Sequence, residues 1–92
     1  MIKSFKHKGL ERFYLHNSTA GIQSRHALKL LTILARLDIA YEVEDMALPG
    51  LRLYRLKGVR QDTWSVWVSG NWRVTFCFHE HHAIDVNYED YH

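Results

Sequence analysis

The chain has 92 residues, of which 47% are hydrophobic, 13% aromatic and 24% charged. This length and composition suit the core of one small domain and exclude both an intrinsically disordered protein and a two-domain enzyme. The single cysteine excludes an internal disulfide, and no apolar run is long enough to span a membrane. Because the first residues also lack the apolar stretch of a signal peptide, we expect one cytoplasmic domain over residues 1–92.

Short periodic patterns occupy the beginning of the chain. Residues 1–5 alternate as a short strand does. Residues 8–16 place Leu10, Phe13 and Tyr14 three and four positions apart, which predicts a short amphipathic helix. A turn is expected before residue 22.

The strongest helical pattern follows. We expect Ser24 to be the N-cap of a helix that ends by Ile39, with one further helical turn over residues 41–46. Pro49 and Gly50 then end the helical part of the chain. The apolar stripe of the long helix is expected to consist of Ala27, Leu30, Leu31, Leu34 and Leu37.

Beyond residue 50 the hydrophobic period changes to two, which indicates β-strands. Strands are predicted from Leu51, over residues 63–68, and from Trp72 after a hairpin turn. After a second turn over residues 79–82, a last strand is expected to bury Ile84, Val86 and Tyr88. The predicted fold class is α+β, with two N-terminal helices packed on an antiparallel sheet of about four to five strands.

Strand alternation predicts which side chains leave the core. Trp72, Val74 and Phe76 share the core face, so Arg73 is expected to project from the opposite, open face. The other residues expected on that open face are Thr75, Cys77, Ser65 and Trp67.

The charge is modest overall, at +2, but it is unevenly distributed. Residues 52–73 hold five basic side chains against one acidic side chain, a net charge of +4. Residues 79–92 hold four acidic side chains and no lysine or arginine, a net charge of −4. This arrangement can bind phosphate on one side and supply a carboxylate on the other, although charge alone favours a solvated surface of mixed sign.

Four segments of the chain, in order, resemble the HigB toxins of the RelE superfamily. They are MIKSFKHKGL at residues 1–10, RLKG at 55–58, WSVWVSGNWRVTF at 64–76 and NYEDYH at 87–92. The resemblance implies a compact RelE-like fold and a toxin of a type II toxin–antitoxin system. Its implied activity is that of a ribosome-dependent endoribonuclease, which cleaves messenger RNA in the A site and inhibits translation and growth. The implied partners are a HigA-like antitoxin, the 70S ribosome and messenger RNA, and neither a metal nor another cofactor is implied.

The resemblance also implies the catalytic residues of a reaction in which the 2′-hydroxyl of RNA attacks the adjacent phosphorus. Lys57 and Arg73 match basic residues of the family and are expected to hold the phosphate. Asp90, Tyr91 and His92 match the acidic, aromatic and histidine end of the family. His92 is expected to transfer protons near neutral pH, Asp90 to act as a base or orient a partner, and Tyr91 to stack on or hydrogen-bond a base.

Tyr54 departs from the family pattern, in which a histidine occurs in the strand before RLKG. A phenol is a poor base near neutral pH, so proton transfer is expected to depend on Asp90 and His92. Tyr54, Arg55 and Arg60 are expected to bind substrate.

Other functions are compatible with parts of the pattern. A toxin of the same fold that poisons DNA gyrase, as ParE-like proteins do, would not need the catalytic set, and a simple RNA-binding module would leave RNA intact. The histidines of residues 79–82 suggest a metal site, but a solvated hairpin turn explains them better because no second ligand group has supporting spacing.

Overall fold

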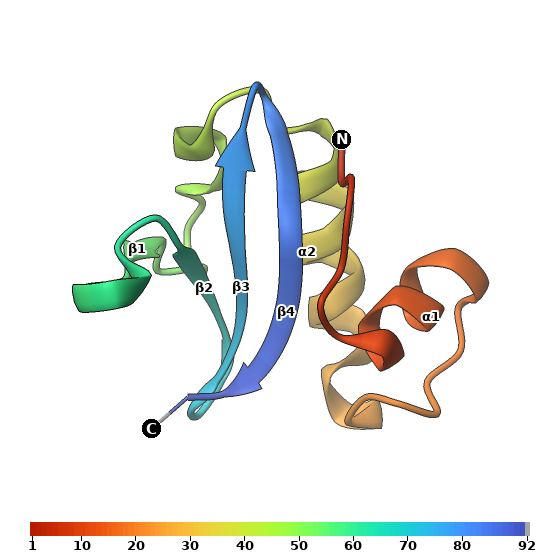
Figure 1. The fold of residues 1–92 in the computed structure, drawn as a ribbon. Helices are drawn as coiled ribbons and strands as arrows, with labels where there is room; N and C mark the ends of the chain where they lie inside the picture. Colours follow the sequence, from red (N-terminus) through yellow and green to blue (C-terminus); the bar gives the residue numbers. More distant parts are fainter. Residues whose placement is uncertain (92) are drawn as a thin grey trace.

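Two α-helices and a four-stranded antiparallel sheet follow one another along residues 1–91, which the structure, a computed structural model, describes (Figure 1). This arrangement confirms the predicted α+β fold class. The helices are α1 (Lys8–His16) and α2 (Ala27–Ile39). The strands are β1 (Tyr54–Arg55), β2 (Trp64–Ser69), β3 (Trp72–His79) and β4 (His82–Asp90). Short 3-10 turns are found at Ser24–His26, Val43–Met46 and Gly58–Arg60.

The strands are neighbours in chain order, β1-β2-β3-β4. Tight turns join the last three strands, and positive φ angles at Gly70 (56°), Glu80 (49°) and His81 (67°) match the twist that two-residue hairpins require. β1 is shorter than predicted and does not begin at Leu51. The reason is that Arg52 has a φ of 50°, which interrupts the extended backbone of a strand.

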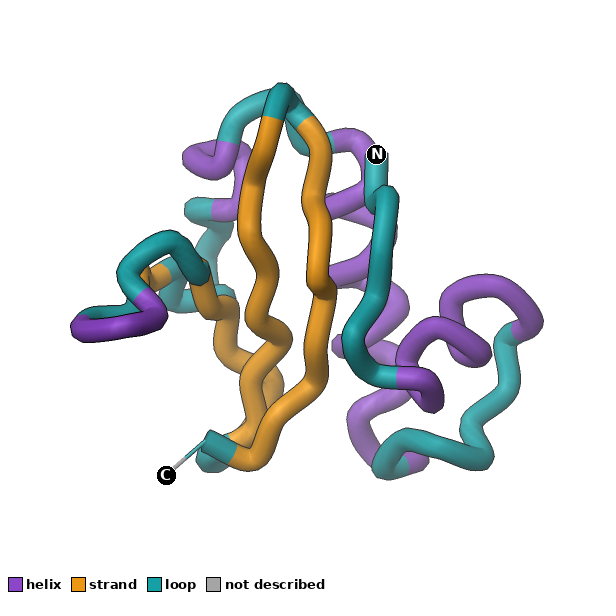
Figure 2. The backbone as a smooth tube through the Cα atoms, viewed as in Figure 1, coloured by secondary structure: helices purple, strands orange, loops and turns teal. Residues whose placement is uncertain are grey.

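The N-terminal segment lies beside β4 as an extended chain rather than as the predicted regular strand (Figure 2). The backbone N–H groups of Lys3 and Lys6 donate to the carbonyls of Ala83 and Val86, both at 2.8 Å. These bonds make isolated parallel bridges. The segment therefore covers the outer edge of β4 before the chain enters α1.

α1 has the predicted bounds because both of its ends are capped. The backbone N–H of Leu10 donates to Nδ1 of His7 at 2.9 Å, which satisfies one of the free donors of the first turn. Asn17 adopts a φ of 59° at the other end, and its N–H donates to the carbonyl of Phe13 at 2.9 Å.

α2 differs from the prediction at its start and in its buried face. Ser24 lies in a 3-10 turn and is not the N-cap of α2, which begins at Ala27. Leu31, predicted to be buried, is 54% exposed and lines a hollow between α1 and α2, because the helix turns a different edge toward the sheet. The buried residues of α2 are Leu30, Ile33, Leu34 and Leu37.

A β-bulge changes which residues of β4 face the core. Between two of the positions at which β3 and β4 pair, β4 contains one residue more than β3. Asp85, with a φ of 53°, lies at this irregularity. Ala83, Val86 and Tyr88 are buried, whereas Ile84, predicted to be a core residue, is only partly buried.

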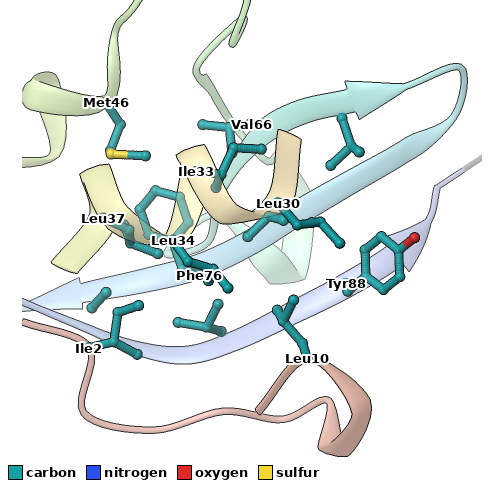
Figure 3. Packing of buried hydrophobic residues seen from close by; sticks show 14 of the residues in the cluster. Ile2, Leu10, Leu30, Ile33, Leu34, Leu37, Met46, Val66, Phe76 and Tyr88 are labelled. Carbon is teal, nitrogen blue, oxygen red and sulfur yellow. The ribbon is translucent and has the colours of Figure 1, made fainter. Parts of the chain in front are cut away.

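The core lies between α2 and one face of the sheet (Figure 3). Leu10 reaches it from α1 and Met46 from the segment after α2. Phe76 occupies its centre with no exposed surface, as its strand phase predicts. The other fully buried aliphatic residues of this core are Leu30, Ile33, Leu37, Val66, Val74, Ala83 and Val86.

Two glycines allow α1 to lie against the loop that precedes α2. A Cβ atom on Gly9 would lie 2.5 Å from the carbonyl oxygen of Gly21 and 2.7 Å from its Cα. Both obstacles are backbone atoms, which cannot rotate away.

We expect Gly9→Ala to lower the free energy of unfolding by about 1–3 kcal/mol, because the backbone must move to admit the methyl group. The higher helix propensity of alanine opposes this loss by about 1 kcal/mol. A net stabilisation would show that the loop around Gly21 moves at little energetic cost. Urea unfolding measures the effect. Lys8→Ala, at the exposed start of the same helix, is the control and should change stability by less than about 0.5 kcal/mol.

A polar pair is buried at one end of the core. Nδ1 of His26 and the hydroxyl oxygen of Tyr88 are 2.5 Å apart, and the ring of Tyr88 stacks on Trp72 with a centroid distance of 4.5 Å. Burial lowers the pKa of His26, and the neighbouring Arg25 guanidinium lowers it further. The folded protein therefore favours a neutral His26.

The free energy of unfolding should fall as the pH is lowered below 6.5, the unfolded value for His26. Between that value and the lower pKa of the folded state, the unfolded chain binds more protons, so acid favours unfolding. Urea titrations between about pH 7 and about pH 5 measure this slope, which His26→Gln should reduce. Equal slopes for the variant and the parent would contradict the assignment.

Candidate active site

A cavity of about 410 Å³ lies on the face of the sheet that is turned away from α2. Its walls come from the first three strands, from the segments beside β1, and from the residue that follows β4. The lining residues are Arg52, Leu53, Tyr54, Leu56, Ser65, Arg73 and Tyr91. The cavity thus brings together three predicted site residues that are far apart in the sequence.

Strand register explains this convergence. Tyr54 on β1 pairs with Ser65 on β2. Arg73 on β3 pairs with Trp67 on β2 and with Glu89 on β4. Directly paired residues of an antiparallel sheet point to the same face, so these side chains share the side opposite the core.

The face of the sheet beneath the cavity and beside it is not the open surface that strand alternation alone suggests. Ser65 and Thr75 have the predicted phase, yet each is only 1% exposed. The hydroxyl of Thr75 donates to the carboxylate of Glu89, whereas that of Ser65 has no hydrogen-bond partner within residues 1–91. The expectation of a solvated face is therefore wrong at these two positions, because the segments around β1 cover this part of the sheet.

Arg73 and Tyr91 lie at the hairpin end of the cavity. The backbone N–H of Tyr91 donates to the carbonyl of Asn71 at 2.7 Å, which fixes the end of the chain beside the turn that precedes Arg73. Tyr91 remains 39% exposed. Within residues 1–91 the ion pairs do not include Arg73, so its guanidinium is available to an anion.

Arg60 is engaged by Glu89. Its two terminal nitrogens donate to the two carboxylate oxygens at 3.1 and 2.6 Å. These hydrogen bonds are the main cause of a lowered pKa of Glu89, against the opposing effect of burial, and they raise the pKa of Arg60. The pair fastens the segment around Gly58–Arg60 to β4.

Lys57 and Arg55 line an adjoining hollow of about 370 Å³, which shares Leu56 with the cavity. Nε of Arg55 donates to the carbonyl of Gln61, and its guanidinium lies 5.7 Å from the ring centroid of Trp64. Lys57 is exposed. The structure therefore places Lys57 beside the cavity rather than within it.

Asp90, the acidic member of the predicted set, does not line the cavity. Asp90 is exposed and pairs with Trp72, and strand alternation assigns it to the face opposite Arg73. His92 lies outside the described residues.

Arg52 and Glu89 are absent from the predicted set. Glu89 has a signal in the sequence, because it alternates with the apolar Tyr88 and so shares the phase of Tyr91. Arg52 belongs to the basic stretch of residues 52–73, but its place in the cavity depends on a left-handed backbone that arginine seldom adopts.

Residues 1–91 contain no group of three histidine, cysteine, aspartate or glutamate side chains placed to hold a metal ion. No helix in this part of the chain has the length and hydropathy to cross a membrane.

Comparison with known proteins agrees with the four matched segments. Residues 3–92 match the family described as RelE-like toxin of type II toxin-antitoxin system HigB. The chain is also 40% identical to Endoribonuclease HigB of Proteus vulgaris over 92 residues, which cover 100% of both chains. The matched range spans all the positions that line the cavity, and the chain belongs to the HigB family of RelE-like toxins of type II toxin–antitoxin systems.

Proposed function

We propose that this toxin is a ribosome-dependent endoribonuclease that cleaves messenger RNA in the A site by metal-independent attack of a 2′-hydroxyl. The observation that carries the proposal is the meeting of Arg73, Tyr54 and Tyr91 in one cavity. A guanidinium binds phosphate, and aromatic rings stack on or hydrogen-bond unpaired bases. The name of the 40% identical relative, Endoribonuclease HigB, supports the same chemistry.

The proposed reaction forms a bond between the 2′-oxygen and phosphorus and breaks the bond to the 5′-oxygen. The 2′-hydroxyl must lose a proton, the leaving 5′-oxygen must gain one, and negative charge must be stabilised on the phosphorane. Arg73 is suited to the last task, because its planar group can place two N–H donors on the phosphate oxygens. Lys57, from the adjoining hollow, adds a second positive charge.

The remaining roles follow from position and chemistry. We assign proton transfer to His92, because histidine is the side chain type whose ordinary pKa lies closest to neutral pH, and base contact to Tyr91 and Tyr54. Asp90 is assigned an orienting role, because strand alternation puts it on the face opposite Arg73.

Arg55 and Arg60 are now assigned to the loop that carries Lys57 rather than to substrate. Arg55 donates to the carbonyl of Gln61, and Arg60 is held by the carboxylate of Glu89. A guanidinium that is already paired has fewer donors left for RNA. Their proposed task is to hold Lys57 beside the cavity.

A type II toxin acts with an antitoxin, and we propose a HigA-like protein as the partner of this chain. Ribosome-dependent cleavage would place its action in the cytoplasm. The ribosome would supply what a cavity of this size lacks, a surface that holds the message in an extended form for attack.

We expect Arg73→Ala to slow single-turnover cleavage on programmed ribosomes by about 10²–10³-fold, the usual cost of losing one donor to a developing anion. The matched control is Arg36→Ala, on the exposed side of α2, which removes the same charge far from the cavity lining. Circular dichroism should show an unchanged fold. Full cleavage by the folded Arg73→Ala variant would refute the proposed site, and intact transcripts with broken DNA in cells would favour a gyrase poison.

Lys57→Ala should have a milder effect, about a tenfold loss of cleavage rate, since Lys57 lines the adjoining hollow while Arg73 still holds the phosphate. The same single-turnover assay compares the two variants directly. A loss as large as that of Arg73→Ala, or no loss at all, would show that Lys57 is wrongly placed in this scheme.

A further inference from the structure

Arg52 occupies the cavity rim in a conformation that its local sequence does not demand. Its φ is 50°, in the left-handed region that side-chain-bearing residues seldom adopt. The other non-glycine residues with positive φ have local reasons, namely a helix C-cap, a hairpin turn and a β-bulge. Those residues are Asn17, Glu80, His81 and Asp85. An unusual backbone with no such local reason often marks a functional position.

Trp67 holds Arg52 from two sides. The backbone N–H of Trp67 donates to the carbonyl of Leu51 at 2.7 Å, which fixes the chain immediately before Arg52. The guanidinium carbon of Arg52 lies 4.2 Å from the centroid of the Trp67 ring. The ring is itself oriented, because its indole N–H donates to the carbonyl of Gly70 at 2.9 Å. A planar cation on an aromatic face keeps its edge donors free for a further partner.

Positive charge accumulates around this indole. Nζ of Lys29 lies 5.1 Å from the ring centroid of Trp67, and Arg73 is the cross-strand partner of Trp67 on β3. Arg52 and Arg73 both line the cavity, and the ion pairs of residues 1–91 include neither of them. Arg60, by contrast, is neutralised by Glu89. Two available guanidinium groups at one cavity favour a ligand with more than one negative charge.

We propose that Arg52 binds a second phosphate of the RNA, adjacent to the one that Arg73 holds, and that Trp67 is its positioning residue. The assignment rests on the proposed function and extends it from one phosphate to two. Consecutive phosphates bound in this way would fix the direction of the strand as it crosses the cavity. The base between these phosphates and the base next to it would then meet Tyr54 and Tyr91, which line the same walls.

The test uses programmed ribosomes whose messenger RNA carries a neutral methylphosphonate at one linkage at a time near the cleavage position. Arg52→Gly should raise the half-saturating toxin concentration about tenfold while changing the rate at saturation much less. At one position, the methylphosphonate should raise the half-saturating concentration of the parent protein to that of Arg52→Gly. The same substitution should not change the half-saturating concentration of the variant. Glycine tolerates a positive φ, so the melting temperature should not fall.

Two further variants separate charge from stacking. Arg52→Lys keeps the charge but not the planar fork, and Trp67→Leu keeps Arg52 but removes its aromatic support. Both variants should raise the half-saturating toxin concentration, and Arg36→Ala should leave it unchanged. A further measure is binding of a short 2′-deoxy oligonucleotide, where Arg52→Gly should lower the slope of log affinity against log salt by about 0.7, the value for one lost single-strand phosphate contact.

The outcomes distinguish this inference from the proposed function. In one outcome the parent protein cleaves, Arg73→Ala does not, and Arg52→Gly has the same half-saturating concentration as the parent. This outcome refutes the second phosphate site and leaves the proposed active site in place. The second phosphate site would also be refuted if Arg52→Gly raises the half-saturating concentration but no methylphosphonate position raises that of the parent protein. Arg52 would then not act through a phosphate. A parent protein that cleaves no ribosome-bound RNA would refute both.

Discussion

The pairing of β3 with its two neighbours is the constraint on which both the core and the cavity depend. Successive side chains of a strand point to opposite faces, so the register that buries Val74 and Phe76 under α2 also presents Arg73 to the other side. A slip of one residue would reverse every position and bring a guanidinium into the core. Burying an unpaired charge costs several kcal/mol. The free-energy difference between the native and the shifted register therefore fixes both the packing of the core and the position of Arg73 in the site.

The pair formed by Arg60 and Glu89 joins two parts of the site that the sheet alone does not connect. Its side chains are 38% and 19% exposed, so solvent screens the pair less than it screens a fully exposed one. Glu89 also accepts from Thr75 on the neighbouring strand. The loop that carries Lys57 is thereby attached to β4, the strand that leads directly into Tyr91.

The sequence predicts the parts of this molecule in which local patterns and tertiary packing agree. α1, the β2–β3 hairpin and the outward phase of Arg73 follow from periodicity, because the apolar positions that set the period of these elements are buried in the core. The bulge at Asp85 and the bend at Arg52 could not be predicted, since both depend on positive φ at residues that usually avoid it. For the same reason, the cavity could be predicted only in part. Strand phase predicts that Tyr54 and Arg73 share a face with Ser65, but the buried floor exists only because the chain folds back after Arg52.

The bonds between the N-terminal segment and β4 join the first residues of the chain to nearly the last. Lys3 bonds to Ala83 and Lys6 to Val86, so the edge of the sheet cannot be completed until β4 has been synthesised. Arg73 and Tyr91 likewise meet only after the final strand pairs with β3. A nascent chain whose β4 is still held in the exit tunnel of a ribosome therefore lacks the assembled cavity, and the site can form only after β4 and Tyr91 have emerged from the tunnel.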